Sequence, residues 1–256
     1  MRNPRTLVMA VASALCLSGL SAQAQNSGLA FSLTAGLGVA PSYFGSSSYR
    51  VGPSGSLGFN GLRMGGLQIG DPDSTDRFAP GTGIGAAFRY IGARRGRDEL
   101  AGLADVSSAV ELGLRLRHTA SSWQVYAELR RGVTGHSGWA GELGANAILR
   151  SQGGFVFHAG PRAEYGDGRF MRTYFGVTPA EAGRSNLSAH RPGGGLASVG
   201  FEIGGYQPLN DDWGITGSLR LDRLQRGAAA SPIVQQGRRD QARATIGLTR
   251  HLRLGF

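Results

Sequence analysis

Apolar residues recur at every second position along the last fifteen residues of the chain. This set comprises Ala242, Ala244, Ile246, Leu248, Arg250, Leu252, Leu254 and Phe256, with Arg250 as its single polar member. The positions between them are polar or small, from Arg243 to Gly255. A period of two is typical of a β-strand whose two faces meet different surroundings. The stretch therefore predicts a strand that runs to the end of the sequence.

The same alternation recurs along the chain in segments of about ten residues, which is typical of a transmembrane β-barrel. The expected strands are 29–39, 50–59, 62–70, 82–91, 108–118, 122–131, 137–149, 154–165, 195–206, 213–224 and 242–256. Leu114 and Leu116, for example, alternate with Arg115 and Arg117. A soluble β-sandwich or lipocalin-like barrel also alternates, but it would bury the apolar face. The regular placement of Glu, Arg and Asp on the other face indicates that this other face is the wet interior.

The strand count is predicted as ten to twelve, because single-chain bacterial barrels have even numbers of strands and eleven segments are visible. Either Asn60-Gly61 is not a hairpin turn and its flanks form one bent strand, or a further strand lies in Phe170–Val177, and twelve is favoured. The connections 119–122, 150–153 and 207–212 resemble tight turns. The segments 92–107, 166–194 and 225–241 are long enough to carry a binding surface, and the sequence leaves their orientation open.

Aromatic residues stand near the ends of the expected strands, where an interfacial girdle would place them. They are Trp123, Trp139, Tyr165, Tyr206 and Trp213. Each of them, taken alone, is equally consistent with ordinary packing.

The beginning of the chain has the features of a secretory signal peptide. Arg2 and Arg5 precede an apolar run from Leu7 to Leu20, and Ala22-Gln23-Ala24 forms a cleavage site. We therefore expect residues 1–24 to be a signal peptide and 25–256 to be an outer-membrane β-barrel. The only cysteine, Cys16, lies in the signal peptide, so the mature chain is expected to use neither disulfides nor cysteine-ligated metals. A terminal strand that closes on Phe256 resembles the insertion signal of bacterial outer-membrane barrels.

The charge of the chain is strongly basic, since all 27 basic residues are arginines against 17 acids. A basic surface can indicate nucleic acid, but export favours other counter-charges, and we expect no nucleic-acid partner. The expected counter-charges are outer-membrane lipid and lipopolysaccharide phosphates or anionic murein. The plainer interpretation is that the arginines are solvated on loops and in the lumen.

Several ordered motifs resemble the MipA/OmpV family. They are Pro41-Ser42-Tyr43-Phe44-Gly45-Ser46, Glu99-Leu100-Ala101-Gly102-Leu103-Ala104-Asp105-Val106, Gly135-His136-Ser137-Gly138, Tyr174-Phe175-Gly176-Val177-Thr178-Pro179, Gly193-Gly194-Gly195-Leu196, Trp213 and Ser231-Pro232-Ile233-Val234. The match spans the mature chain. Arg223-Leu224-Gln225-Arg226-Gly227 departs from the family's Arg-Leu-x-Gly-Asp stretch, and the second strand segment is rich in glycine and poor in aromatics.

The resemblance implies a non-enzymatic outer-membrane scaffold that docks murein-remodelling enzymes, a lytic transglycosylase and a murein synthase. It implies no catalytic residues. A small-solute channel is the main alternative, with Arg115, Arg117, Arg130, Arg162 and Arg220 facing the lumen and selecting anions. An adhesin is a third reading.

No constellation of catalytic or metal-binding residues is visible in the sequence. The five histidines have no metal-ligand spacing, and no spacing selects a nucleophile and base from the candidate residues. These candidates are Asp105, Ser107, Ser108, His118, His136 and Ser137. We therefore expect no catalytic, cofactor-binding or metal site and no cofactor. Gly81-Thr82-Gly83-Ile84-Gly85 and Gly193-Gly194-Gly195 lack the ending of a phosphate loop.

The stretch from Tyr174 to Gly183 predicts one helical turn that serves as a plug or docking element. Thr178 is the expected N-cap, Pro179 the first helical residue, Glu181 the capping-box partner and Gly183 the stop. The plainer reading is a loop packed on the barrel rim. Asp71-Pro72-Asp73-Ser74-Thr75-Asp76 lacks the glycine and final Glu of a calcium loop, so we expect a solvated loop there.

Overall fold

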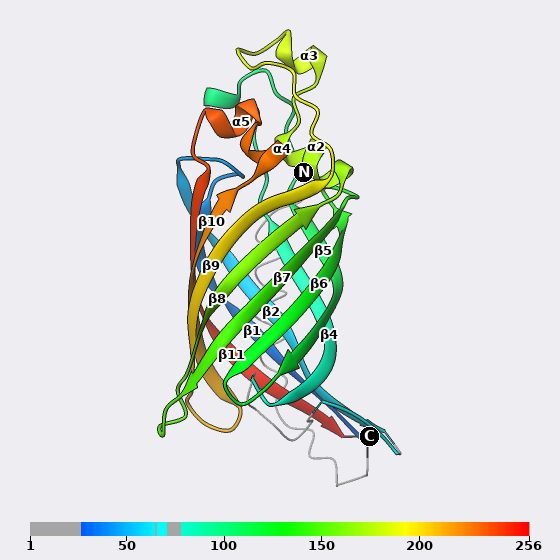
Figure 1. The fold of residues 1–256 in the computed structure, drawn as a ribbon, viewed down its shortest axis with the longest axis vertical. Coiled ribbons are helices and arrows are strands. Elements are labelled where there is room, and N and C mark those ends of the chain that lie inside the picture. The colour runs from blue at the N-terminus through cyan, green and yellow to red at the C-terminus, as the bar shows by residue number, and fades with distance from the viewer. Residues whose placement is uncertain (1–26, 65, 71–77, 256) are drawn as a thin grey trace.

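The protein is an antiparallel β-sheet wrapped into a nearly closed barrel, with short helices gathered at one end (Figure 1). The structure is a computed structural model that describes residues 27–64, 66–70 and 78–255. The expected signal peptide, the acidic loop 71–76 and Phe256 lie outside the described residues. The prediction of a transmembrane-type antiparallel barrel is confirmed.

Eleven strands make up the sheet in this described part. They are β1 (Gly28–Pro41), β2 (Tyr49–Met64), β3 (Leu67–Gly70), β4 (Gly81–Ile91), β5 (Ala109–Thr119), β6 (Trp123–Thr134), β7 (Trp139–Arg150), β8 (Val156–Gly166), β9 (Gly195–Pro208), β10 (Trp213–Leu224) and β11 (Asp240–Gly255). Neighbours in the sheet are neighbours in sequence, except that β1 pairs with β11. The count falls inside the predicted range of ten to twelve.

The two ends of the barrel differ in their connections. At one end Gly28 of β1 pairs with Gly255 of β11, and the short turns 120–122, 151–155 and 209–212 join successive strands. We call this the turn end. The segments 42–48, 92–108, 167–194 and 225–239 all lie at the opposite end, the loop end. The expected tight turns and long connections are thus confirmed, and they segregate to different ends.

Short helices fold the loop end into a compact layer that we call the cap, consisting of residues 42–48, 92–108, 167–194 and 225–239. Its helices are α2 (Gly168–Phe175), α3 (Pro179–Ala182), α4 (Arg226–Ala229) and α5 (Pro232–Gln235), with a 3₁₀ turn at Asp98–Leu100. Figure 1 shows α2 and α4 directly above the strands and α3 farthest from them. None of the helices in the described residues is long and apolar enough to cross a membrane.

The outer face of the barrel is apolar. Its exposed side chains include Leu112, Leu114, Leu116, Leu129, Leu143, Leu149, Phe201, Ile215, Leu219, Leu221, Ile246 and Leu248. Leaving so many aliphatic side chains uncovered is unfavourable in water but favourable in lipid. Trp123, Trp139 and Tyr165 are also exposed near strand ends, as a girdle requires. Tyr206 is an exception, because it is buried and bonded to His251 Nε2 at 2.7 Å.

Two stretches decide the strand count, and the structure confirms the prediction for one of them and not for the other. Asn60-Gly61 is not a hairpin turn, since β2 runs through it, with a register shift opposite Ala30/Phe31 that bends the strand. The expected strand in Phe170–Val177 is wrong, because residues 170–175 lie in helix α2. The Asp167 side chain caps this helix by accepting hydrogen bonds from the N–H groups of Arg169 and Phe170.

Candidate functional site

The lumen holds a network of charged side chains, which we call the ionic cluster. Its members are Arg89, Glu111, Arg115, Glu128, Arg130, Glu142, Arg162, Glu164, Glu202, Arg220 and Asp222. They come from strands β4 to β10, each at an inward position of its strand. Because inward positions repeat every second residue, alternating charges in sequence converge in the barrel interior.

Glu111 is the most enclosed carboxylate of the cluster, with no exposed side-chain surface. Arg89 donates to both of its oxygens, at 2.8 and 2.9 Å, in the bidentate geometry that suits a guanidinium. Arg130 Nε donates at 3.2 Å, and His136 Nε2 lies 3.1 Å away. Since Gly138 N–H donates to His136 Nδ1, Nε2 carries the proton and donates to Glu111. Glu111 thus has hydrogen bonds from three side chains.

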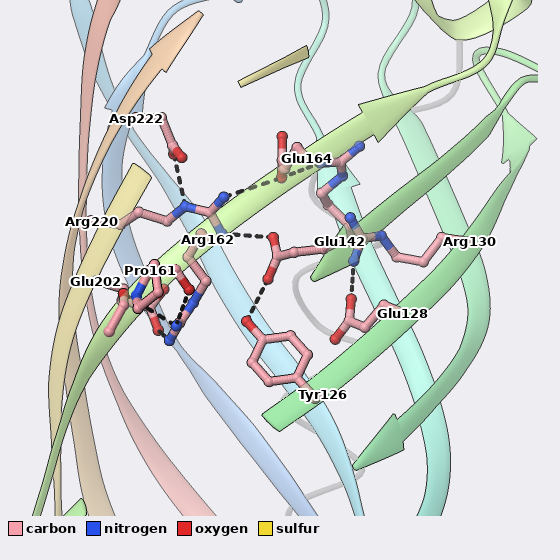
Figure 2. Close-up of polar contacts among 12 residues, drawn as sticks. Tyr126, Glu128, Arg130, Glu142, Pro161, Arg162, Glu164, Glu202, Arg220 and Asp222 are labelled. Atoms are coloured by element: carbon pink, nitrogen blue, oxygen red, sulfur yellow. Dashed lines mark hydrogen bonds and ion pairs between the residues drawn. The ribbon is translucent and has the colours of Figure 1, made fainter. Parts of the chain in front are cut away.

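Arg220 joins two sides of the cluster, as Figure 2 shows. Its Nε bonds Asp222 at 2.7 Å and its Nη1 bonds Glu142 at 2.7 Å, while Nη2 lies 3.5 Å from Glu164. Glu142 lies on β7 and Arg220, 78 residues later, lies on β10. Because these two strands are not neighbours in the sheet, the bond crosses the lumen. The cluster therefore bridges the barrel from wall to wall.

A second layer lies nearer the turn end. Arg162 Nη2 donates to Glu202 and to Asn146, both at 2.8 Å, and Tyr126 donates to Glu142 at 2.6 Å. The Tyr126 ring occupies the space beside Gly144, where an added Cβ would lie 2.4 Å from it. The glycine thus makes room for a ring that carries the Arg115 guanidinium at 4.8 Å.

Helix α2 of the cap rests directly on the ionic cluster. Phe170, Met171, Tyr174 and Phe175 form an apolar core with α4, α5 and the strand ends, and all four are at most 3% exposed. The Phe170 ring lies 5.4 Å from the Arg89 guanidinium and 5.5 Å from the His136 ring. The loop end of the lumen is therefore covered by packed side chains.

Hydrogen bonds tie the segments of the cap together. Arg94 Nη1 donates to Tyr174 O at 3.0 Å, and burial lowers the pKa of Arg94. Ser231 Oγ donates to Phe175 O at 2.7 Å. Tyr43 donates to Glu99 at 2.9 Å, and burial together with this bond raises the pKa of Tyr43 to about 12. Each bond joins two different cap segments.

The predicted helical turn at Thr178 is confirmed. Thr178 caps α3, Pro179 is its first residue, and Glu181 completes the capping box. Glu181 also accepts a hydrogen bond from Ala104 N–H at 2.9 Å. Burial opposes ionisation of this carboxyl, but the N–H groups of Ala104 and Thr178 overcome that effect and lower the pKa of Glu181. The turn packs within the cap, farthest from the strands and not on the barrel rim where the plainer reading placed it (Figure 1).

Two cavities remain in the lumen. The larger, about 500 Å³, lies toward the loop end, and the smaller, about 260 Å³, toward the turn end. Both are lined by Arg115, Tyr126, Glu202 and Thr245, which therefore separate them. The expected lumen arginines do line these cavities, but Arg115, Arg130, Arg162 and Arg220 are paired with carboxylates.

The residues weighed as catalytic candidates are not brought together. Asp105 bonds Arg95 and Gly96 in the cap. His118 is exposed near the turn end of β5 and bonded to Thr82, whereas His136 is buried at the loop end. In the part of the chain that the structure describes, no group of three or more His, Cys, Asp or Glu residues is placed to hold a metal ion.

Arg89 and Glu142 were not predicted from the sequence to face the lumen. Arg89 and Glu142 each stand alone in a glycine- and alanine-rich strand, so the alternation around them is weak. The inward orientation of Arg89 could still be predicted from the alternation, because Arg89 shares one face of the expected strand 82–91 with Gly83 and Gly85. The alternation does not predict which side chains Arg89 and Glu142 contact.

An apolar outer face, a charged interior and turn and loop ends of unequal length define an outer-membrane β-barrel protein. The family model of the MltA-interacting protein MipA matches residues 33–252, and the chain belongs to this family. No curated protein matches the sequence.

Solved outer-membrane proteins match at low identity. An outer-membrane channel from Pseudomonas putida F1 is 10% identical with a TM-score of 0.47, covering 92% of this chain and all of that one. The outer membrane protein OprG from Pseudomonas aeruginosa is 10% identical with a TM-score of 0.32, covering 89% and 97%. Neisserial surface protein A is 10% identical with a TM-score of 0.28, covering 89% and 99%.

Proposed function

We propose that the protein is a non-enzymatic scaffold of the outer membrane that docks murein-remodelling enzymes, a lytic transglycosylase and a murein synthase. The observation that carries the proposal is the charge-paired lumen beneath a packed cap, combined with membership of a family whose model is described as an MltA-interacting protein. A barrel of this kind acts through its surfaces.

The turn end is the surface that we assign to docking. Outer-membrane barrels have short periplasmic turns and longer extracellular loops, so we infer that the turn end faces the periplasm, where murein lies. The segment 166–194, which the sequence offered as a docking element, lies at the loop end. Docking at the cap would therefore place a murein enzyme on the wrong side of the membrane.

The channel alternative has less support. Arginines that face the lumen select anions only if their charge is uncompensated, and here the ionic cluster pairs four of the five, Arg115, Arg130, Arg162 and Arg220, with carboxylates. The cluster also spans the lumen, and the cap covers its loop end. An adhesin would use the outer surface of the cap, and no observation on that surface favours it.

A quantitative pull-down from detergent-solubilised envelopes tests the proposal. The tagged barrel is compared with a tagged barrel of similar size and charge, and murein hydrolases and synthases are scored. We expect selective enrichment, and we expect a short epitope inserted after Gln152 in a turn to abolish it. The same epitope inserted after Asn186 in the cap is the matched control and leaves enrichment unchanged. Equal recovery with the control barrel, with and without crosslinking, refutes the proposal.

A further inference from the structure

The sheet is not closed by hydrogen bonds between β2 and β4. β4 pairs with β5 only, and β2 pairs with β1 and, from Gly61 onward, with β3. Among the described residues, nothing pairs with the edge of β2 from Tyr49 to Asn60 that faces β4. Pro53 lies on this stretch, and proline, which has no N–H, is found in sheets at such edges.

Two contacts frame an opening along this seam. Toward the loop end, Arg50 Nη1 donates to Ala93 O at 3.1 Å, which joins the start of β2 to the segment after β4. Farther toward the turn end the strands touch, since a Cβ on Gly85 would lie 3.3 Å from Phe59 Cβ. We call the part between these contacts, residues 51–58 and 86–91, the window.

The larger cavity reaches the outer face through the window. Its lining includes inward Arg89 but also Val51, Phe88 and Tyr90, which are 68%, 41% and 42% exposed on the outside of the barrel. Unpaired backbone groups are costly in lipid but tolerated where they line a water-filled cavity. The cavity therefore explains how this seam persists in a membrane, and it connects a polar interior to an apolar rim.

The carboxylates that line the cavity are all paired. Each lining carboxylate forms an ion pair with an arginine, as in Glu128–Arg130, Glu142–Arg220, Glu164–Arg89, Glu202–Arg162 and Asp222–Arg220. Arg50 and Arg243 also line the cavity, and within the described part of the chain neither is held in an ion pair, although Arg243 lies within electrostatic reach of Glu164 and Asp222. The cavity thus offers two guanidinium groups that no ion pair holds in place.

The strand register brings these two arginines to one level of the barrel. Arg50 pairs with Ala40, and Val39 pairs with Ala244, so the next position along sets Arg243 opposite Ala40. Two strand spacings, roughly 10 Å, separate the backbones. Arg50 here reaches the other way, to Ala93 O, so it must exchange this bond for the anion in order to share one with Arg243. Ser198 Oγ and Asp222 Oδ1 line the same cavity without a hydrogen-bond partner among the described residues.

We propose that the window binds a phosphate-bearing membrane lipid. Its phosphate is held by Arg50 and Arg243, because guanidinium groups match phosphate oxygens in geometry and charge. Its acyl chain lies along the window against Val51, Phe88 and Tyr90. Arg50 is the second residue of β2 at the loop end, so the phosphate sits at the level of the strand ends and the chain points toward the membrane interior.

Lipid binding to the purified full barrel, measured by native mass spectrometry, tests this site. The probes are dioleoyl phosphatidic acid, dioleoyl phosphatidylcholine and oleic acid, with inorganic phosphate as a competitor. We expect phosphatidic acid to bind at least roughly tenfold more tightly than the other two, the scale of one charge-assisted hydrogen bond. We expect competition by free phosphate only at far higher concentration. The proposal is overturned if phosphatidylcholine or oleic acid binds as tightly as phosphatidic acid.

Variants test separately whether the two arginines and the open cavity are needed for lipid binding. Replacing both Arg50→Ala and Arg243→Ala should weaken phosphatidic acid binding roughly tenfold or more, whereas Arg169→Ala, on the exposed face of the cap, should leave it unchanged. Gly52→Trp should abolish binding with both arginines present, because a Cβ at Gly52 meets nothing within 4 Å and the ring enters the cavity.

Each variant is first checked for folding by the heat-dependent shift of the barrel on a gel. Unchanged binding by folded Gly52→Trp or by the folded double variant overturns the site. The assay contains no murein enzyme, so its failure leaves the docking proposal standing.

Discussion

Removal of the Glu111 carboxylate is expected to destabilise the barrel through its charged interior. The side chain is fully buried and accepts hydrogen bonds from Arg89, Arg130 and His136. Breaking a buried ion pair by deleting one partner costs about 3–5 kcal/mol, because the remaining charge stays buried. Arg89 retains Glu164 at 2.9 Å and Arg130 retains Glu128. We therefore expect Glu111→Ala to lower the free energy of unfolding by about 3 kcal/mol, the lower end of that range.

Urea unfolding of the barrel in lipid vesicles, followed by tryptophan fluorescence, measures this loss. Glu111→Gln keeps a hydrogen-bond acceptor and should cost less than Glu111→Ala. Asp240→Ala is the matched control, because Asp240 and Arg223 form an ion pair at 3.4 Å with side chains 71% and 63% exposed. Such a pair contributes about 0–1 kcal/mol. If Glu111→Ala costs no more than Asp240→Ala, the ionic cluster does not stabilise the lumen.

Three further predictions address the closed lumen, the cap and its pH dependence. The purified barrel in a planar bilayer should show no steady ionic current, and a stable anion-selective current would contradict the paired lumen. Phe175→Ala, at a side chain 1% exposed, should cost about 3–5 kcal/mol and make the cap protease-sensitive, whereas cleavage equal to wild type would show that α2 is not packed. The lowered pKa of Glu181 gives the cap stability that is present above the ordinary value of about 4.3 and lost as pH falls through the lowered value. Amide exchange at Ala104 should therefore accelerate on acidification in wild type and not in Glu181→Gln, and equal pH profiles would refute this linkage.

The barrel walls could be predicted from the sequence because lipid and lumen impose a period of two on every strand. The Leu114–Arg117 alternation and the final strand show this directly, and both have the expected faces in the structure. Tyr206 was misplaced because parity, and not nearness to a strand end, decides whether an aromatic side chain faces the lumen or the lipid.

The helix in place of the expected twelfth strand had a signal of its own. Phe170, Met171, Tyr174 and Phe175 follow a helical spacing after Asp167, a favoured N-cap. A strand was expected here because it would make the strand count even, but the tertiary packing of the cap selected the helix. The capping box at Thr178 and Glu181 was predictable because it is local in sequence.

The partners within the ionic cluster could not be predicted from the sequence. The bond between Glu142 and Arg220 depends on how strands β7 and β10 face each other across a closed barrel. This geometry follows from the register of every intervening strand. The window could not be predicted for the same reason, because nothing in the sequence of β2 or β4 alone shows that their edges meet without pairing.

Position-specific photocrosslinking in living cells tests the central claim of docking at the turn end most directly. A photoreactive residue is placed at exposed turn positions Ser121, Gln152 and Asp211, and at exposed cap positions Asn186 and Ser188 as controls. The docking account predicts crosslinks to a lytic transglycosylase or a murein synthase from the turn positions only. Crosslinks to these enzymes from the cap, or from neither set while the barrel is folded and abundant, would contradict it.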